Sequence, residues 1–318
     1  MKYSILIPAY KETFLKECID SILNQTYSDF EVIIVNDNSP YKLDDIIHTY
    51  NDSRIRYYKN DKGFGAINLA GNYNKCLEYA KGDYTIILGD DDKLISDCLE
   101  NYNKLMIKYP DLDLYHTRLQ FIDEKSEVFD VQEPRPEYES VYSMILFFWR
   151  HRRQRFGDWL FKTSTLRDNG GFFFLKLGWG TDDLSAFMAA KEKGVANTST
   201  FGFQYRENQQ TITSNSNYAF IKAETVLELR KWYNSFLESV PNDPTDRLYR
   251  NILKRGLNQQ LNKYIIANIE TSLNEHPNTF FRWLKECKQY KVSKMKVISL
   301  YTHIMIYKTK TSLKRLTK

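Results

Sequence analysis

The sequence predicts an α/β fold with a mostly parallel sheet flanked by helices, followed by a helical C-terminal region. Two observations carry this prediction. Within the first 125 residues, short β-prone runs alternate with stretches of helical periodicity, which is typical of a parallel sheet with helices on its faces. Beyond about residue 215, strand alternation stops, so we predict a domain boundary there.

The elements of the first region follow from runs of apolar residues and their spacing. β-rich runs predict strands over residues 4–7, 31–35, 55–58, 84–88 and 113–117. Apolar residues at helical spacing predict helices over 15–23 and 66–80, and Lys81-Gly82 closes the second helix. Prolines among charged residues make the segment 126–137 typical of a surface loop or of an excursion around the sheet.

The remainder of the chain divides into a mixed stretch and a helical stretch. Helices are predicted over 138–150 and 182–193, and a last strand is predicted over 200–206. Helical spacing then continues over 219–240, 244–269 and 278–290. We therefore predict a first domain of residues 1–215 and a helical region of residues 216–318.

Composition and cysteine placement exclude several classes of protein. With 318 residues, 42% of them hydrophobic and 27% charged, the chain resembles an ordinary soluble globular protein. Apolar runs are too short for a membrane-spanning helix and the start is too strand-like for a signal peptide, so the expected location is the cytoplasm. The cysteines (Cys18, Cys76, Cys98 and Cys287) lack metal-ligand spacing and are predicted to be buried thiols.

Positive charge is concentrated at the C-terminal end. The net charge is +5, and residues 288–318 contain nine Lys or Arg and no Asp or Glu. Apolar side chains, among them Met295, Ile298 and Ile306, lie between these charges. The pattern favours either an amphipathic helix on anionic lipid at the inner face of the membrane or a solvated helix packed on its own domain. Nucleic-acid binding is not expected, because no recognised motif accompanies the charge.

The run from Tyr84 to Asp92 is the most informative part of the chain. A buried-strand pattern ends there in three consecutive carboxylates, Asp90, Asp91 and Asp92. Adjacent acids repel one another, so a compensating divalent cation, Mg²⁺ or Mn²⁺, is the simplest physical account. The alternative is a solvated turn with an aspartate that caps the following helix.

Polar segments follow other predicted strands as well. They comprise residues 8–12 after the first strand, 36–39 after the second, 90–92 after the fourth and 181–183 at a helix start. Because the carboxyl ends of parallel strands open onto the ligand crevice, we expect these segments to meet at one edge of the sheet.

With these motifs the chain resembles glycosyltransferase family 2, whose Rossmann-like nucleotide-binding fold is called GT-A. The resemblance rests on residues 5–10 with 15–25, 32–39, 60–80 and 82–92, and it extends more loosely over 155–215. It implies inverting transfer of a sugar from a nucleotide-diphosphate donor, a UDP-sugar being favoured. The implied acceptor is a hydroxyl of a glycan or lipid-linked molecule, in surface or capsular polysaccharide synthesis.

The same resemblance implies roles in donor binding. The implied residues are Pro8, Ala9, Tyr10, Glu12, Asp37, Asn60, Asp83, Asp90 and Arg206. Asp37 matches the acid that meets the base of the nucleotide, and a carboxylate can accept hydrogen bonds from base or ribose. Asp83 is expected at the edge of the base, with capping or a salt bridge as the alternative. Arg206 is expected at the diphosphate, with a surface salt bridge as the alternative.

The metal motif of the family is D-x-D, and Gly89 occupies its first position in this chain. The resemblance implies Asp91 as the first metal ligand and Asp92 as a second candidate. Asp90 is then expected on the ribose or on metal-bound water.

The segment Thr181-Asp182-Asp183 resembles the T-E-D element of processive members, and Gly178-Trp179-Gly180 resembles part of the W-G-x-E-D run of galactosyltransferases. Carried over, Asp183 is the general base and Asp182 its acidic neighbour. A carboxylate beside another carboxylate has a raised proton affinity, which suits removal of a hydroxyl proton. The alternative is a helix N-terminus stabilised by acids. Trp159 and Trp179 are candidates for stacking on an acceptor sugar, with core packing as the alternative.

Two other functions remain open from the sequence. A sugar-1-phosphate nucleotidyltransferase also combines an α/β nucleotide fold with magnesium carboxylates, but residues 8–12 lack the glycines of its phosphate loop. A donor-binding or scaffold protein that has lost catalysis is the non-enzymatic alternative. The presence of both Asp91 and Asp183 argues against it.

Overall fold

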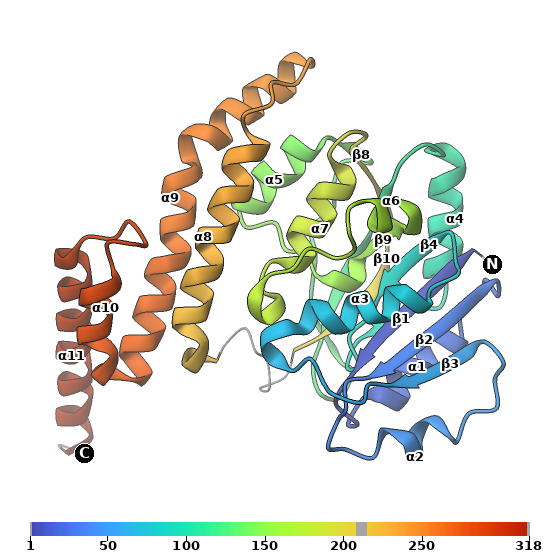
Figure 1. The fold of residues 1–318 in the computed structure, drawn as a ribbon, viewed down its shortest axis with the longest axis horizontal. Helices are drawn as coiled ribbons and strands as arrows, with labels where there is room; N and C mark the ends of the chain where they lie inside the picture. Colours follow the sequence, from blue (N-terminus) through green and yellow to red (C-terminus); the bar gives the residue numbers. More distant parts are fainter. Residues whose placement is uncertain (1, 208–214, 317–318) are drawn as a thin grey trace. The chain divides into compact units, whose positions relative to one another are not determined.

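The computed structural model describes residues 2–207 and 215–316, with side chains as far as residue 311 (Figure 1). The chain divides into two compact units, Met1–Gln210 and Thr211–Lys318. The sequence predicted this division near residue 215. The predicted candidate active-site residues all belong to the first unit.

The first unit is built on one ten-stranded sheet with the order β3-β2-β1-β4-β9-β6-β10-β5, in which β7 pairs with β6 and β8 with β10. The strands are β1 (Tyr3–Ala9), β2 (Phe30–Asn36), β3 (Ile55–Lys59), β4 (Tyr84–Ile87), β5 (Lys93–Leu94), β6 (Leu114–Ile122), β7 (Val128–Val131), β8 (Tyr138–Glu139), β9 (Trp159–Lys162) and β10 (Val195–Arg206). The α/β fold class is confirmed, although the sheet is mixed: β9 runs antiparallel to both β4 and β6.

Helices flank this sheet (Figure 1). They are α1 (Leu15–Leu23), α2 (Leu43–Ile47), α3 (Leu69–Tyr79), α4 (Cys98–Lys108), α5 (Val141–Trp149), α6 (Thr163–Asp168) and α7 (Thr181–Ala190), with short 3₁₀ turns η1 (Ala66–Asn68), η2 (Phe156–Asp158) and η3 (Lys176–Gly178). Alternate side chains of a strand point to opposite faces, so Ile5 and Ile7 of β1 join the core formed with α1, α2 and α4. The cysteines are free and buried, as predicted.

Some elements differ from the sequence prediction. The segment predicted as a loop over 126–137 contains β7, whose four residues are all exposed at the sheet margin. Helix α4 and the short strands β5 and β9 were not predicted, because two to four residues give too little periodicity for a strand. Strand β10 begins at Val195, earlier than the predicted residue 200.

Strand register brings the polar segments to one edge of the sheet. Ala9 of β1 lies opposite Asn36 of β2, and the N–H of Leu88 donates to the carbonyl of Leu6. Residues 10–12, 37–39 and 89–92 therefore emerge together. Because β9 is antiparallel to β4, the segment that enters β9, residues 154–158, lies at this same edge.

The second unit is helical, as the sequence predicted. It contains η5 (Ser216–Tyr218), α8 (Ala219–Phe236), α9 (Pro244–Glu275), η6 (Pro277–Thr279), α10 (Phe280–Glu286) and α11 (Lys294–Leu316). Helix α9 begins at the N-cap Asp243, whose carboxylate accepts from two backbone amides, and Pro244 occupies the first helical turn. Across residues 2–207 and 215–316, no helix is both long enough and apolar enough to cross a membrane.

Candidate functional site

Asp90 fastens the loop after β1 to the end of β4. One carboxylate oxygen, Oδ2, accepts the backbone N–H groups of Tyr10 and Lys11, each at 2.6 Å. Burial and the adjacent Asp91 raise the pKa of Asp90 to about 6, although these backbone hydrogen bonds act in the opposite direction. Asp90 therefore holds the loop that contains the predicted donor residue Tyr10.

Asp91 is the most open of the three consecutive carboxylates. Its side chain is 18% exposed, and Oδ2 lies 3.2 Å from the Nζ of Lys11. Asp92 is buried, and its Oδ1 accepts the backbone N–H of Arg206 at 2.9 Å. Burial and the charge of Asp91 raise the pKa of Asp92 well above its ordinary value. The cluster thus concentrates negative charge that a cation would stabilise.

The space around Gly89 shows why a residue with a side chain does not fit at the first position of the D-x-D pattern. A Cβ added at this position would lie 2.8 Å from Oδ2 of Asp92 and 3.1 Å from Oδ1 of Asp91. Oxygens of both carboxylates therefore converge over the glycine, and a side chain there would push them apart. Within the described parts of the chain, no group of three or more His, Cys, Asp and Glu side chains is arranged to hold a metal ion.

Arg206 lies behind the cluster, and its predicted role at a diphosphate is wrong. The residue is 1% exposed. Its Nε donates to the carbonyl of Asp91, Nη1 to the carbonyl of Asp123, and Nη2 to Glu17 and Ser126. The alternative of a surface salt bridge is also wrong, because this guanidinium is buried. Arg206 supports the backbone of the cluster.

Asp37 organises the loop that follows β3. Its Oδ1 accepts from the amide of Asn60 at 3.1 Å and from the N–H of Phe64 at 2.8 Å, and its Oδ2 accepts the N–H of Gly65 at 3.0 Å. Asn60 also donates to Asn72 of α3. The structure therefore brings together the predicted donor residues Asp37 and Asn60.

The other predicted donor residues after β1 lie beside this loop. Ala9 is buried, and Glu12 accepts the backbone N–H of Lys42 at 3.2 Å. Tyr10 is 46% exposed and packs edge-to-face on Tyr41, with ring centroids 6.2 Å apart. Pro8 is half-buried within β1. An exposed aromatic pair at the end of β1 offers a flat surface to a base or sugar.

Asp83 does not join the site, so its predicted role at the base is wrong. It is exposed and precedes Tyr84, which pairs with Tyr3 at the start of β1. Asp90 lies beyond the far end of the same strand, so the two carboxylates occupy opposite edges of the sheet. Asp83 is close to Asp90 in the sequence, but this closeness does not bring it into the site.

Asp182 and Asp183 occupy the first turn of α7. Gly178 and Gly180 precede them with φ of 62° and 87°, conformations that side chains rarely adopt, and so make the turn into the helix possible. The Oδ1 of Asp183 accepts from Nε2 of Gln154 at 2.6 Å. Burial raises the pKa of both carboxyl groups, and in Asp183 the charge of Asp182 raises it further.

Arg155 and Tyr73 connect the two acidic groups. The positive charge of Arg155 lowers the pKa of Asp92 and that of Asp183, opposing the effect of burial in each case. The pKa of Tyr73 is raised by burial and by the charges of Asp182 and Asp90. Arg155 and Tyr73 therefore each lie within electrostatic reach of both acidic groups, which indicates that the two groups lie near each other.

The two predicted acceptor residues, Trp159 and Trp179, differ in their burial. Trp159 is fully buried, with its ring 4.8 Å from that of His116, so its prediction as an acceptor platform is wrong and core packing is its role. Trp179 is half-buried in the turn between Gly178 and Gly180. Its position beside Asp182 leaves the acceptor prediction in place for Trp179 alone.

Sequence reasoning missed four residues of this site: Lys11, Tyr73, Gln154 and Arg155. Lys11 lies in the sequence between the predicted donor residues Tyr10 and Glu12, and this position was the signal that could have found it. In the structure its ammonium group lies beside the acidic cluster. Gln154 and Arg155 belong to the basic run of residues 150–155, which matches no motif. Arg155 stacks over Tyr205 at 4.5 Å, which holds its charge near the cluster.

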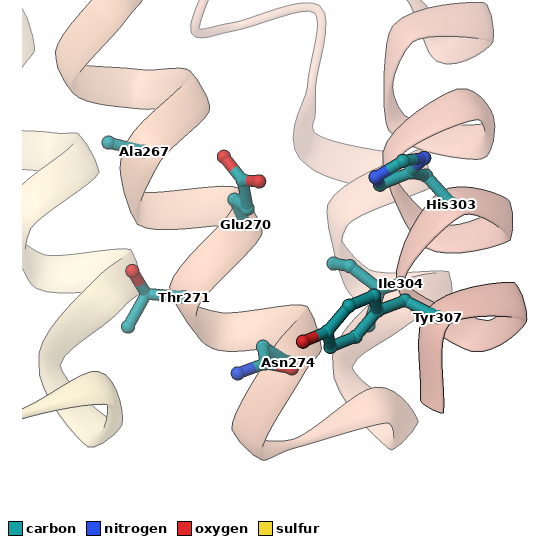
Figure 2. Close-up of a pocket in the computed structure, with 7 residues that line it drawn as sticks. All are labelled: Ala267, Glu270, Thr271, Asn274, His303, Ile304 and Tyr307. Carbon is teal, nitrogen blue, oxygen red and sulfur yellow. The ribbon is translucent and has the colours of Figure 1, made fainter. Parts of the chain in front are cut away.

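A separate hollow lies in the helical unit between α9 and α11, which form its opposite walls (Figure 2). Its lining residues are Ala267, Glu270, Thr271, Asn274, His303, Ile304 and Tyr307. Only one carboxylate belongs to this lining, so the hollow lacks the paired acids of the first unit.

Known proteins resemble the chain in sequence and in fold. The model of the family "Glycosyl transferase family 2" matches residues 4–176. An uncharacterized glycosyltransferase of Methanocaldococcus jannaschii is 32% identical over 169 residues, 52% of this chain and 57% of the relative. The GalNAc(5)-diNAcBac-PP-undecaprenol beta-1,3-glucosyltransferase of Campylobacter jejuni is 34% identical over 101 residues, 31% of this chain and 32% of the relative.

A longer but weaker match is the poly(ribitol-phosphate) beta-glucosyltransferase of Bacillus spizizenii, 27% identical over 203 residues, 62% of this chain and 31% of that protein. The chain thus spans between about a third and just over half of these relatives. The crystal structure of S. aureus TarS 1-349 in complex with UDP-GlcNAc has a TM-score of 0.62 at 14% identity, covering 98% of this chain and 92% of that chain. This likeness shows the GT-A fold, and the family match across more than half of the sequence shows that the chain belongs to glycosyltransferase family 2.

Proposed function

We propose that this chain is an inverting glycosyltransferase that moves a sugar from a nucleotide-diphosphate donor to a hydroxyl of a glycan or lipid-linked acceptor. One observation carries the proposal: two acidic groups, Asp90 to Asp92 and Asp182 to Asp183, lie at one edge of the sheet, because Gln154, in the segment that enters β9 beside the end of β4, donates to Asp183. The first group suits a diphosphate and its cation, and the second suits deprotonation of a hydroxyl.

The donor occupies the first unit in this proposal. TarS binds UDP-GlcNAc and UDP, which favours a UDP-sugar here. Asp37 and Asn60 fix the loop that meets the base, and Tyr10 flanks it. Lys11 and Arg155 are the cations near the departing diphosphate, taking over the role that the sequence had given to Arg206.

The residues also fit a divalent cation. Asp91 and Asp92 present oxygens that converge over Gly89, and burial together with the charge of Asp91 raises the pKa of Asp92. Two protein carboxylates with diphosphate and water oxygens are a ligand set that Mg²⁺ or Mn²⁺ accepts. When bound, the cation neutralises charge that develops on the leaving diphosphate.

Asp183 takes the proton in the transfer step. Its Oδ1 is engaged by Gln154, so the other oxygen receives the hydroxyl proton of the acceptor. The acceptor oxygen bonds to the anomeric carbon as the bond from that carbon to the diphosphate oxygen breaks, and the nucleoside diphosphate leaves. Attack from the face opposite the leaving group inverts the configuration in one step, without a covalent intermediate on the protein.

A thermal-shift screen of nucleotide diphosphates and nucleotide sugars tests the donor site. A ligand that binds only the folded state raises the apparent melting temperature by mass action. We expect uridine diphosphate and one UDP-sugar to raise it in the presence of Mn²⁺, and other bases to have a smaller effect. Equal responses to every base, or none to any, would contradict the proposed donor class.

The second unit is proposed to contact anionic membrane, which suits a lipid-linked acceptor and the synthesis of surface or capsular polysaccharide. The relative from Campylobacter jejuni has an undecaprenol-linked glycan in its name. On α11, Met295, Ile298, Met305 and Ile306 are 37% to 80% exposed and recur at helical spacing, while Val297 and Ile304 face the protein interior.

The lysines of α11 favour an anionic lipid surface as the partner of this exposed apolar stripe. Lys294, Lys296, Lys308 and Lys310 belong to the same helix, and acidic residues are absent from residues 288–318 of the sequence. An apolar stripe accompanied by cations matches an anionic lipid surface, and a second copy of this equally basic helix would be repelled.

Vesicle sedimentation tests the membrane contact. We expect the full chain to sediment with vesicles containing phosphatidylglycerol and to be released by high salt. The double variant Ile298→Asp with Ile306→Asp should weaken binding by at least about tenfold, because it places carboxylates in the stripe. Ile107→Asp is the matched control, since Ile107 is 82% exposed on α4 of the first unit. Equal binding by both variants would contradict the assigned surface.

A further inference from the structure

A cluster of buried polar side chains connects to Asp183 through Gln154. Its members come from β6, the segment after β7, β8, the segment between α5 and η2, and η2 itself, and each is at least nine-tenths buried. They are His116, Gln132, Arg135, Glu139, Gln154 and Asp158. The proposed base is thus continuous with an extended polar interior.

The chemistry of Arg135 fixes the orientation of the Gln154 amide. The Nη2 of Arg135 lies 3.4 Å from Oε1 of Gln154 and 3.3 Å from the carbonyl of Arg153. A guanidinium has donors and no acceptor, so only the amide oxygen of Gln154 can face it. The amide nitrogen must then point the other way, where it donates to Asp183 at 2.6 Å.

Arg135 is held in place as a buried cation. Its guanidinium lies 5.0 Å from the ring centroid of Trp159, and Nη1 is 3.8 Å from Oε1 of Glu139. Burial lowers the pKa of Arg135 to about 10, so the group stays charged at neutral pH. Arg152 also pairs with Glu139, which leaves that carboxylate shared between two arginines.

This interior keeps polar atoms that a purely structural core would avoid. Within residues 2–207, hydrogen-bond partners are missing for both ring nitrogens of His116, Oδ1 of Asp158, Oε1 of Gln132, and Nε and Nη1 of Arg135. Buried polar groups without partners cost stability, and apolar residues would remove that cost. Local conflicts of this kind are expected where a polar environment serves a functional site.

We infer that Gln154 and Arg135 are positioning residues for the proposed base: Arg135 orients the Gln154 amide, and Gln154 engages one oxygen of Asp183 so that the other is directed to the acceptor. The inference rests on the proposed function of Asp183. It assigns to the basic run of residues 150–155 a role that its sequence did not suggest.

The charged groups around Asp183 set the direction of the pH effect. Burial, Asp182 and Asp158 raise the pKa of Asp183, whereas the hydrogen bond from Gln154 and the charge of Arg155 lower it. Arg135 interacts attractively with Asp183 as well. Loss of the Gln154 donor therefore raises the pKa of the base, and turnover, which needs the ionised carboxylate, then requires a higher pH.

The pH profile of kcat in three variants tests the inference. Gln154→Ala should lower kcat at neutral pH by about tenfold to a hundredfold and move the acid limb up by about one pH unit. Gln154→Glu should move it further, because a second carboxylate then faces Asp183. Gln204→Ala is the matched control: Gln204 is half-buried and donates only to Gln120, so its profile should match that of the unmodified protein.

The outcomes separate this inference from the function on which it rests. Retained turnover in Asp183→Asn would overturn both. If Asp183→Asn is inactive but the acid limb of Gln154→Ala and Gln154→Glu stays in place, Gln154 is merely structural and the inference fails alone. Arg135→Lys, which keeps charge without the planar fork, should shift the limb in the same direction as Gln154→Ala, and an unshifted limb in a folded Arg135→Lys would remove Arg135 from the assignment.

Discussion

Asp183→Asn is expected to lower kcat by about 10²- to 10⁴-fold while leaving the dissociation constant for the nucleotide diphosphate nearly unchanged. The substitution keeps the size of the side chain and removes the group that accepts the proton. Asp183 also lies at the start of α7, away from Asp37 and Asn60, which form the proposed base pocket. Single-turnover rates and calorimetric binding of uridine diphosphate would measure the two effects separately.

Asp168→Asn is a suitable control for this experiment. Asp168 is exposed at the end of α6, so its change should leave both turnover and binding intact. An equal loss of binding and turnover in Asp183→Asn would reject the base assignment, since it would place Asp183 in the donor pocket. Full turnover in Asp183→Asn would show that a residue other than Asp183 acts as the base.

Removal of divalent cations is expected to lower turnover by at least about 10²-fold and to weaken diphosphate binding, because the acidic cluster would then face the phosphates without compensation. Asp91→Asn should reproduce much of this loss in the presence of saturating Mn²⁺. The measurements are turnover and calorimetric binding of uridine diphosphate, each with chelator and after addition of Mg²⁺ or Mn²⁺.

The control for Asp91→Asn is Asp97→Asn, which changes an aspartate that precedes α4 and makes no side-chain cap hydrogen bond. It should respond to chelator as the unmodified protein does. Undiminished turnover and binding in chelator would reject the cation, leaving Lys11 and Arg155 as the cationic partners of the diphosphate.

Sequence patterns predicted the parts of the molecule that are local. Strands β1, β2 and β4 consist of apolar runs, and the polar residues that follow them necessarily share an edge of a parallel sheet. The positions of Asp37 and the aspartate cluster could therefore be predicted, whereas Asp183, in the first turn of a helix, was singled out by the family resemblance. Strand β9 was missed because its four residues are too few to show a period, whereas helix α4 was overlooked although its buried residues recur at helical spacing.

Residue roles that depend on distant partners could not be predicted. Arg206 looked like a phosphate ligand, yet its guanidinium bonds to Glu17, 189 residues away, and to the backbone of the cluster. Asp83 is close to Asp90 in the sequence but lies across the whole length of a strand from it. Gln154 became visible only when the structure placed its amide against Asp183.

The hydrogen bonds from the loop after β1 to Asp90 affect how the chain can fold during its synthesis. The bonded groups are separated by 80 and 79 residues in the sequence, so these hydrogen bonds cannot form until β4 has docked beside β1. Contacts of such separation form only after the chain entropy of closing a long loop has been overcome. A nascent chain that has not yet reached residue 90 therefore cannot complete the proposed donor pocket. Binding of the nucleotide cannot guide the earliest folding steps of such a chain.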